Sequence, residues 1–92
     1  METHFHDFLT MLRVERNVST HTMDAYKRDI NQYLVYLGDL DIKNLTDVKS
    51  THIRDYIRML SDRGMAPASI SRIISSIRTY YRFLSSENIL DE

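Results

Sequence analysis

Apolar residues recur every three or four positions along most of this chain, which is the spacing of one face of an α-helix. The pattern is interrupted at three places, and each interruption separates two helical segments. β-branched residues never alternate with polar ones over the length of a strand. We therefore expect an all-α fold with helices over residues 4–16, 20–37, 51–63 and 67–86.

Each interruption carries residue types that favour a helix end. Asn and Gly tolerate the left-handed conformation that follows a helix, whereas Ser accepts a hydrogen bond at the N-cap. Pro suits the first helical position, where its missing N–H has no partner to lose. The expected ends are Asn17, Gly38 and Gly64, and the expected starts are Ser19, Ser50 and Pro67.

Helical spacing also predicts which residues face the core. In the first three helices these are Phe5, Phe8, Leu9 and Leu12; Met23, Tyr26, Ile30, Tyr33, Leu34 and Leu37; and Ile53, Tyr56, Ile57 and Leu60. In the connection over residues 39–49, we expect Leu40, Ile42, Leu45 and Val48 to turn inward.

The last segment divides most clearly into two faces. Its apolar stripe, expected in the core, holds Ile70, Ile73, Ile74, Ile77, Tyr80, Tyr81 and Leu84. Its other side holds Ser69, Ser71, Arg72, Ser75, Ser76, Arg78, Thr79 and Arg82, with no carboxylate before Glu87. A merely solvated helix face usually mixes Glu with Lys, so this acid-free surface is suited to a phosphate-lined partner.

The second segment has a polar face opposite its core stripe. That face holds His21, Ala25, Arg28 and Gln32, flanked by Thr22, Asp24 and Asn31. The small Ala25 lies in its middle and would let another surface approach closely.

Composition limits the classes of function. The 92 residues suffice for one small domain, and the absence of cysteine excludes disulfides and thiolate metal sites. We found no membrane-spanning run and no signal peptide, so we expect a cytoplasmic protein without a membrane partner. The formal charge of −1 is unlike that of a strongly basic nucleic-acid binder, so any DNA binding must depend on local charge.

The sequence offers no recognisable catalytic, metal or cofactor site. His4 and His6 would point to different sides of a helix, and the other histidines lack a ligand at i+4. Neither glycine belongs to a phosphate-cradling loop, and no serine sits in a nucleophile elbow. Tyr80 and Tyr81 lie beside the isoleucines, which predicts core packing instead of a nucleophilic role.

Two stretches, residues 17–30 and 63–84, together resemble a known family. The first fits the pattern S/T-x-x-T-x-x-x-Y-x-x-D through Ser19, Thr22, Tyr26 and Asp29. The second fits a helix pattern through Ser69, Ile70, Arg72, Ser75, Ser76, Ile77, Arg78, Tyr80, Tyr81, Phe83 and Leu84. Both resemble the N-terminal core-binding, SAM-like domain of tyrosine recombinases and phage-type integrases, most closely the bacterial Xer-type recombinases.

This resemblance implies a small four-helix orthogonal bundle, with residues 1–92 as a single core-binding domain. It implies a domain that clamps one face of double-stranded DNA through the second and fourth helices in the major groove. A separate C-terminal catalytic domain, absent from this chain, would supply the catalytic residues, and the recombinase protomers would assemble as a tetramer on DNA. For a Xer-type member the implied task is chromosome-dimer resolution.

Carried over residue by residue, the resemblance predicts a set of DNA contacts. The main candidates are Thr22, Ala25, Arg28, Met65, Ala68, Ser69, Arg72 and Ser76, and the weaker ones are Lys27, Arg78 and Arg82. Arg72 and Arg28 have the reach and fork geometry for a guanine edge or a phosphate, and Ser69 near a helix N-terminus suits a phosphate. Ala25 and Ala68 suit a thymine methyl group, whereas Asp24 would repel the DNA backbone unless it accepts from a cytosine amino group.

Two alternatives to the Xer-type interpretation remain open. The same module occurs in phage and transposon integrases. A helical protein–protein module, in which the Ser/Arg face meets an acidic partner, is the other alternative.

Overall fold

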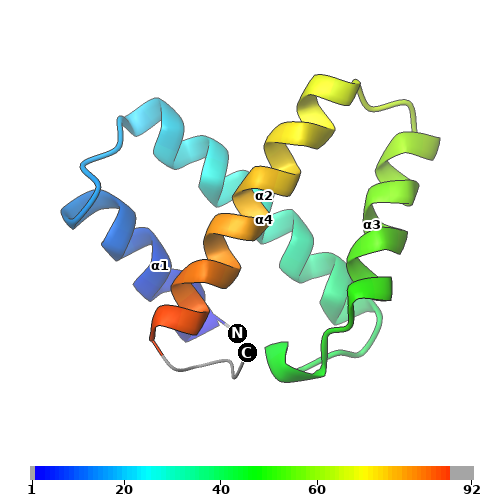
Figure 1. The fold of residues 1–92 in the computed structure, drawn as a ribbon, viewed down its shortest axis with the longest axis horizontal. Helices are drawn as coiled ribbons and strands as arrows, with labels where there is room; N and C mark the ends of the chain where they lie inside the picture. The colour runs from blue at the N-terminus through cyan, green and yellow to red at the C-terminus, as the bar shows by residue number, and fades with distance from the viewer. Residues whose placement is uncertain (1, 88–92) are drawn as a thin grey trace.

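The structure is a computed structural model that describes residues 2–87. Within that range it contains four α-helices and one turn of 3-10 helix, with no strand (Figure 1). The expectation of an all-α, four-helix fold is confirmed. The elements are α1 (Glu2–Val14), α2 (Thr20–Asp39), η1 (Leu45–Asp47), α3 (Ser50–Asp62) and α4 (Pro67–Ser86).

The two longest helices, α2 and α4, cross at the centre of the molecule and pack against each other (Figure 1). α1 packs against α2 and α4 at one end of the crossing, and α3 packs against α4 at the other. Each long helix has 20 residues and is therefore about 30 Å long. The crossing brings together residues more than 40 positions apart in the sequence.

Several predicted helix ends are confirmed. Asn17 adopts a left-handed backbone with φ of 49°, and Gly64 does so with φ of 87°. Ser19 caps α2, because its Oγ accepts a hydrogen bond from the Thr22 N–H at 3.1 Å. Pro67 occupies the first position of α4. The residue types in the α1–α2 and α3–α4 connections therefore suffice to predict where α2 and α4 begin.

The predicted end of α2 at Gly38 is wrong, because the helix continues to Asp39. The N–H of Leu40 still bonds to the Leu37 carbonyl at 3.1 Å, and Asp41 takes the left-handed position with φ of 64°. As a result Leu40 is exposed, not turned inward as predicted. Ile42 and Leu45 are buried as predicted, and Val48 is half-buried.

The predicted cap of α3 also needs correction. Ser50 is the first residue of the helix, and Lys49 is the N-cap. The Lys49 N–H donates to Nδ1 of His52 at 2.9 Å, so a histidine side chain three residues later does the capping. α1 likewise begins and ends about two residues earlier than predicted, at Glu2 and Val14.

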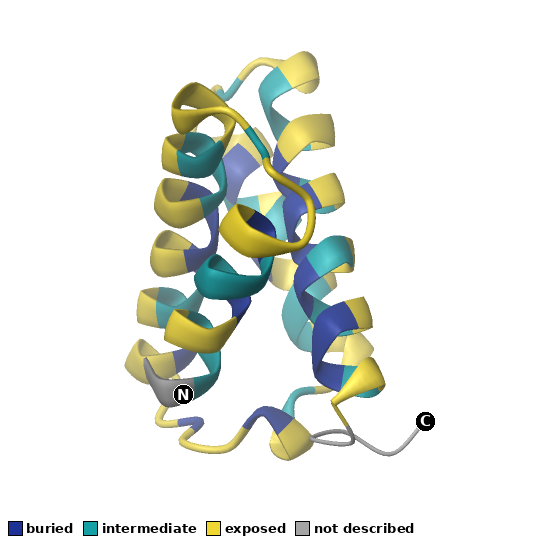
Figure 2. Cartoon of the chain, turned by 90° about the vertical axis from the view of Figure 1, so that its left-hand side faces the viewer, coloured by how far each residue is buried: buried dark blue, intermediate teal, exposed yellow. Residues whose placement is uncertain are grey.

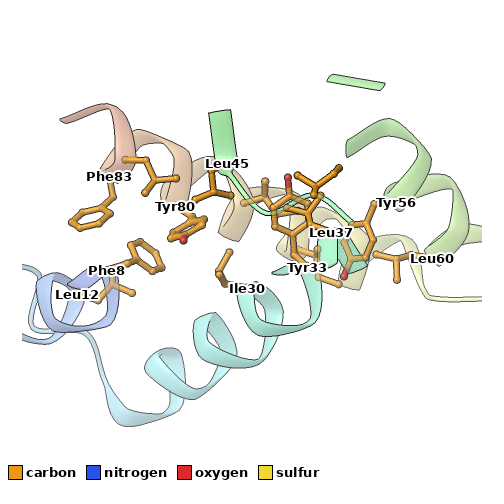
Figure 3. Packing of buried hydrophobic residues seen from close by; sticks show 14 residues of the cluster. Phe8, Leu12, Ile30, Tyr33, Leu37, Leu45, Tyr56, Leu60, Tyr80 and Phe83 are labelled. Carbon is orange, nitrogen blue, oxygen red and sulfur yellow. The ribbon is translucent and has the colours of Figure 1, made fainter. Parts of the chain in front are cut away.

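The core extends along the α2–α4 crossing, with α1 at one end and α3 at the other (Figure 1). The buried residues lie on the inner sides of the helices (Figure 2). Phe8 packs edge-on against Tyr80 with 5.0 Å between ring centroids, and Tyr33 packs against Tyr56 at 5.5 Å (Figure 3). Ile30 lies between these two aromatic groups (Figure 3). Aromatic pairs therefore pack on both sides of Ile30 in a core that is otherwise aliphatic.

Phe83 is buried although it lies outside the predicted stripe of α4. Its ring centroid is 5.6 Å from that of Phe8, because α1 covers the flank of α4 that faces away from α3. A helical stripe predicts one covered side, whereas the second half of α4 is covered on two sides.

Tyr80 and Tyr81 pack in the core as predicted, with Tyr80 fully buried and Tyr81 half-buried. The hydroxyls of Tyr33 and Tyr81 lie 2.8 Å apart and share a hydrogen bond. The buried hydroxyl of Tyr80 finds no hydrogen-bond partner among the described residues. A buried hydroxyl without a partner lowers the stability of the folded state, so Tyr80 stabilises the core through the packing of its ring and not through its hydroxyl.

The variants Tyr80→Phe and Tyr33→Phe should have opposite effects. Tyr80→Phe removes a buried, unpaired hydroxyl and should raise the free energy of unfolding by about 1 kcal/mol. Tyr33→Phe removes a hydrogen bond to Tyr81 and should lower it by about 1 kcal/mol. Urea denaturation followed by circular dichroism measures both, and equal destabilisation by the two variants would contradict the assignment.

Alkaline pH should unfold the domain. Burial raises the pKa of Tyr33, Tyr56, Tyr80 and Tyr81 above the ordinary value of about 10, because the phenolate is poorly solvated in the core. As the pH rises, the tyrosine hydroxyls ionise in the unfolded chain before they ionise in the folded one. The stability that depends on the protonated tyrosines is therefore fully present below pH ~10 and is lost as the pH rises beyond it. Tyrosinate absorbance and loss of helical circular dichroism should rise together; ionisation of all six tyrosines with helicity intact would contradict this.

Candidate nucleic-acid interface

A surface groove lies between α2 and α4 and encloses about 390 Å³. Two segments far apart in the sequence form its walls. We refer to it as the α2/α4 groove, and it is lined by His21, Thr22, Ala25, Tyr26 and Arg28 from α2 and by Arg72, Ser75 and Ser76 from α4.

Helical spacing explains how each helix contributes its wall. Thr22, Ala25 and Arg28 follow one another at intervals of three residues and share one side of α2. Ser75 and Ser76 follow Arg72 at i+3 and i+4 on α4. Ala25 is half-buried and adds only a methyl group, which keeps the groove open. Five of the predicted contacts, Thr22, Ala25, Arg28, Arg72 and Ser76, thus line one groove.

Beneath this groove lies the carboxylate of Asp29, whose side chain is only 1% exposed. Arg72 donates to it twice, from Nε to Oδ2 and from Nη2 to Oδ1, each at 3.1 Å. Ser76 donates a third hydrogen bond from Oγ to Oδ2 at 3.0 Å. Asp29 therefore ties α2 to α4 and satisfies its buried charge through one ion pair and one hydroxyl.

Ser76 was predicted on the exposed polar face of its helix, and this is wrong. Ser76 is buried, since its side of α4 is the side that crosses α2. Its hydroxyl is directed to Asp29, so it supports the groove from below. A direct contact of Ser76 with DNA stays a prediction that this burial disfavours.

The two arginines of the groove are held differently. The Arg72 side chain is 44% exposed, and its hydrogen bonds to Asp29 raise the pKa of a guanidinium that is already always charged. The Arg28 side chain is 55% exposed, and its Nε lies 3.8 Å from Oδ1 of Asp29, beyond hydrogen-bonding distance. Two positive groups and one carboxylate leave a formal charge of +1 at the groove.

The remaining predicted residues lie outside this cluster. Ala68 is exposed and Ser69 is half-buried in the first turn of α4, whereas Met65 packs against the core. Lys27 and Arg78 are exposed on their helices.

Arg82 belongs to a different part of the surface. It lines a second hollow of about 570 Å³ between α1 and α4, together with Thr79, Phe83 and residues of α1. Its position separates it from the α2/α4 groove, although both arginines stand on the acid-free side of α4. A contact of Arg82 with the same ligand as Arg72 therefore gains no support from this geometry.

Asp29 is the functional candidate that side-chain periodicity missed. It follows Tyr26 by three residues and was noted only as part of the pattern that carries the family resemblance. The sequence did offer one signal, because Asp29 is adjacent to the core position Ile30. An aspartate close to the core is expected to have a partner for its carboxylate. The identity of that partner, 43 residues later, depends on the crossing of α2 and α4.

Within residues 2–87 the structure places no group of three acidic, histidine or cysteine side chains in a position to hold a metal ion. Over the same residues, none of the helices is long and apolar enough to span a bilayer.

Comparison with known proteins gives a family match over most of the chain. Residues 5–88 match the family described as phage integrase, N-terminal SAM-like domain. The chain is 42% identical to tyrosine recombinase XerD of Oceanobacillus iheyensis over 90 residues, which make up 97% of this chain and 30% of that protein. It is 32% identical to tyrosine recombinase XerC of Pseudomonas syringae pv. syringae over 89 residues, again 97% of this chain and 30% of that protein.

A further relative is tyrosine recombinase XerD of Bradyrhizobium diazoefficiens, 37% identical over 82 residues, or 89% of this chain and 26% of that protein. No solved structure matches the chain significantly. The chain spans less than a third of the length of these relatives. The resemblance seen in the helix patterns is confirmed, and the chain belongs to the family of phage-integrase N-terminal SAM-like domains.

Proposed function

We propose that this chain is the DNA-binding, core-binding domain of a tyrosine recombinase, and that α2 and α4 enter the major groove of the recombination site. The observation that carries the proposal is the α2/α4 groove, where arginines from both helices meet around one buried carboxylate. The groove combines a net positive charge with hydroxyl and methyl groups, which suit phosphates and base edges.

The family supports the wider setting of this proposal. The relatives named above are called tyrosine recombinases, and each extends well beyond the part that this chain matches. We propose that a separate catalytic domain of the parent protein cleaves and rejoins DNA strands, and that its protomers assemble on DNA. Because the relatives carry Xer names, chromosome-dimer resolution is the task we propose for the parent.

The charge of the domain sets the strength of binding that we expect. The chain as a whole carries a formal charge of −1, so attraction to DNA comes from the local arginines and not from a long-range field. With about three phosphate contacts, the logarithm of the binding constant should fall with the logarithm of salt concentration with a slope of about −3. Such a domain binds weakly at physiological salt and well only at low salt.

Arg28→Ala should weaken binding of the chain to duplex DNA about tenfold at low salt, because it removes one exposed positive charge from the groove. Fluorescence anisotropy with a labelled duplex measures the affinity. Arg58→Ala is the matched control, since Arg58 is an exposed arginine of α3, outside the groove. Arg72→Ala should weaken binding too, but it also deprives Asp29 of its partner, so its folding needs a separate check by circular dichroism.

Absence of binding to any duplex at salt concentrations down to about 20 mM would overturn the proposal. Equal losses for Arg28→Ala and Arg58→Ala would show that the groove is not the binding surface.

NMR chemical-shift mapping distinguishes DNA binding from the protein-module alternative. Added duplex should shift backbone amides of α2 and α4 around Thr22, Ala25 and Arg72, because these residues line the groove. Shifts that avoid both helices, or no shifts with duplex and clear shifts with an acidic peptide, would favour a helical protein–protein module instead.

A further inference from the structure

The guanidinium of Arg72 is held along one edge and free along another. A guanidinium has five N–H groups, and Asp29 accepts from two of them, on Nε and Nη2. The other three point away from this carboxylate, with two on Nη1 and one on Nη2. Arg72 lines the α2/α4 groove and 44% of its side chain is exposed, so a ligand in the groove can reach the guanidinium.

Asp29 is itself fixed in place. Its carboxylate is enclosed between α2 and α4 and accepts from Ser76 as well as from Arg72. A buried carboxylate with three hydrogen bonds has little freedom to rotate, so the orientation of the Arg72 fork is set before any ligand arrives.

The same carboxylate lowers the positive charge of the groove from two to one. That loss is unfavourable if Arg72 serves only to attract phosphate, because the electrostatic part of phosphate affinity grows with the positive charge of the groove. The arrangement is favourable if Arg72 must present two parallel N–H groups in one direction. Among base edges in the major groove, guanine offers two neighbouring acceptors, O6 and N7, to such a pair.

We propose that Asp29 is a positioning residue that holds Arg72 to read the O6/N7 edge of a guanine, while the freer Arg28 contacts a phosphate. This inference rests on the proposed function. Of the two ligands considered for Arg72, a guanine edge and a phosphate, it selects the guanine edge. Arg28 differs from Arg72 because its Nε lies 3.8 Å from Asp29, which leaves its donors unengaged by that carboxylate.

The first experiment selects duplexes with a randomised core on the 92-residue chain at about 50 mM salt. We expect enrichment of guanine at one position. A selected duplex is then compared with the same duplex carrying 7-deazaguanine there, which lacks the N7 acceptor but keeps base pairing and phosphate charge. The wild-type chain should bind the 7-deaza duplex about tenfold more weakly, within the range for a bidentate arginine–guanine pair.

The second experiment measures, for Arg72→Lys and Asp29→Asn, the ratio of the affinity for the guanine duplex to the affinity for the 7-deaza duplex. Arg72→Lys keeps the positive charge without the rigid fork, so the ratio should fall below its wild-type value while overall binding persists. Asp29→Asn frees the fork and raises the groove charge, so the ratio should fall while binding to unselected duplex tightens by about twofold or more. Arg58→Lys on α3 is the matched control and should keep the wild-type ratio.

The ratio separates positioning from a purely structural role. Partial unfolding lowers the affinity for both duplexes equally and leaves their ratio unchanged. If Asp29→Asn does not fold, Arg72→Lys still tests whether the Arg72 fork reads guanine, which the inference requires. Wild-type binding without guanine enrichment, or a 7-deaza effect that keeps its wild-type size in Arg72→Lys, would overturn this inference and leave the proposed function intact. Absence of binding to every duplex would overturn the proposed function itself.

Discussion

The ion pair between Asp29 and Arg72 is the constraint on which the centre of this domain depends. A carboxylate that is 1% exposed needs an opposite charge and hydrogen bonds, because water no longer solvates it. Both requirements are met from α4, by Arg72 and by Ser76, each within about one helical turn of the other. The pair therefore links α2 to α4 at the point where the two helices cross.

The crossing in turn places the core and the groove on opposite sides of the same two helices. Inward, Ile30, Tyr33, Ile77 and Tyr80 build the apolar interior that α1 and α3 close. Outward, the residues that flank Asp29 form the α2/α4 groove. Because one carboxylate joins the packing to the surface, a change at Asp29 affects both the stability of the domain and the shape of the groove. Experiments on this site need readouts that separate the two effects.

Local chemistry and tertiary packing explain different outcomes of the sequence-based predictions. The turns at Asn17 and Gly64 were predictable because a left-handed backbone favours Asn and Gly. The end of α2 was not, because Gly38 remains helical and Asp41 takes the left-handed position instead. Phe83 was left out of the core stripe and Ser76 was assigned to the exposed face, because a helical wheel assumes one covered side, whereas α4 is covered by α1 as well as by α2.

The sequence by itself determined the fold class, the helices, the core stripes and the family, because these follow from the period of apolar residues and from residue patterns along the chain. It also selected the faces of α2 and α4 that line the groove. Only the tertiary structure decided that Arg72 is engaged by Asp29 and that Ser76 lies beneath the surface. The physical reason is that a hydrogen bond between residues 43 positions apart depends on the angle and offset at which two helices cross, and periodicity within one helix contains neither.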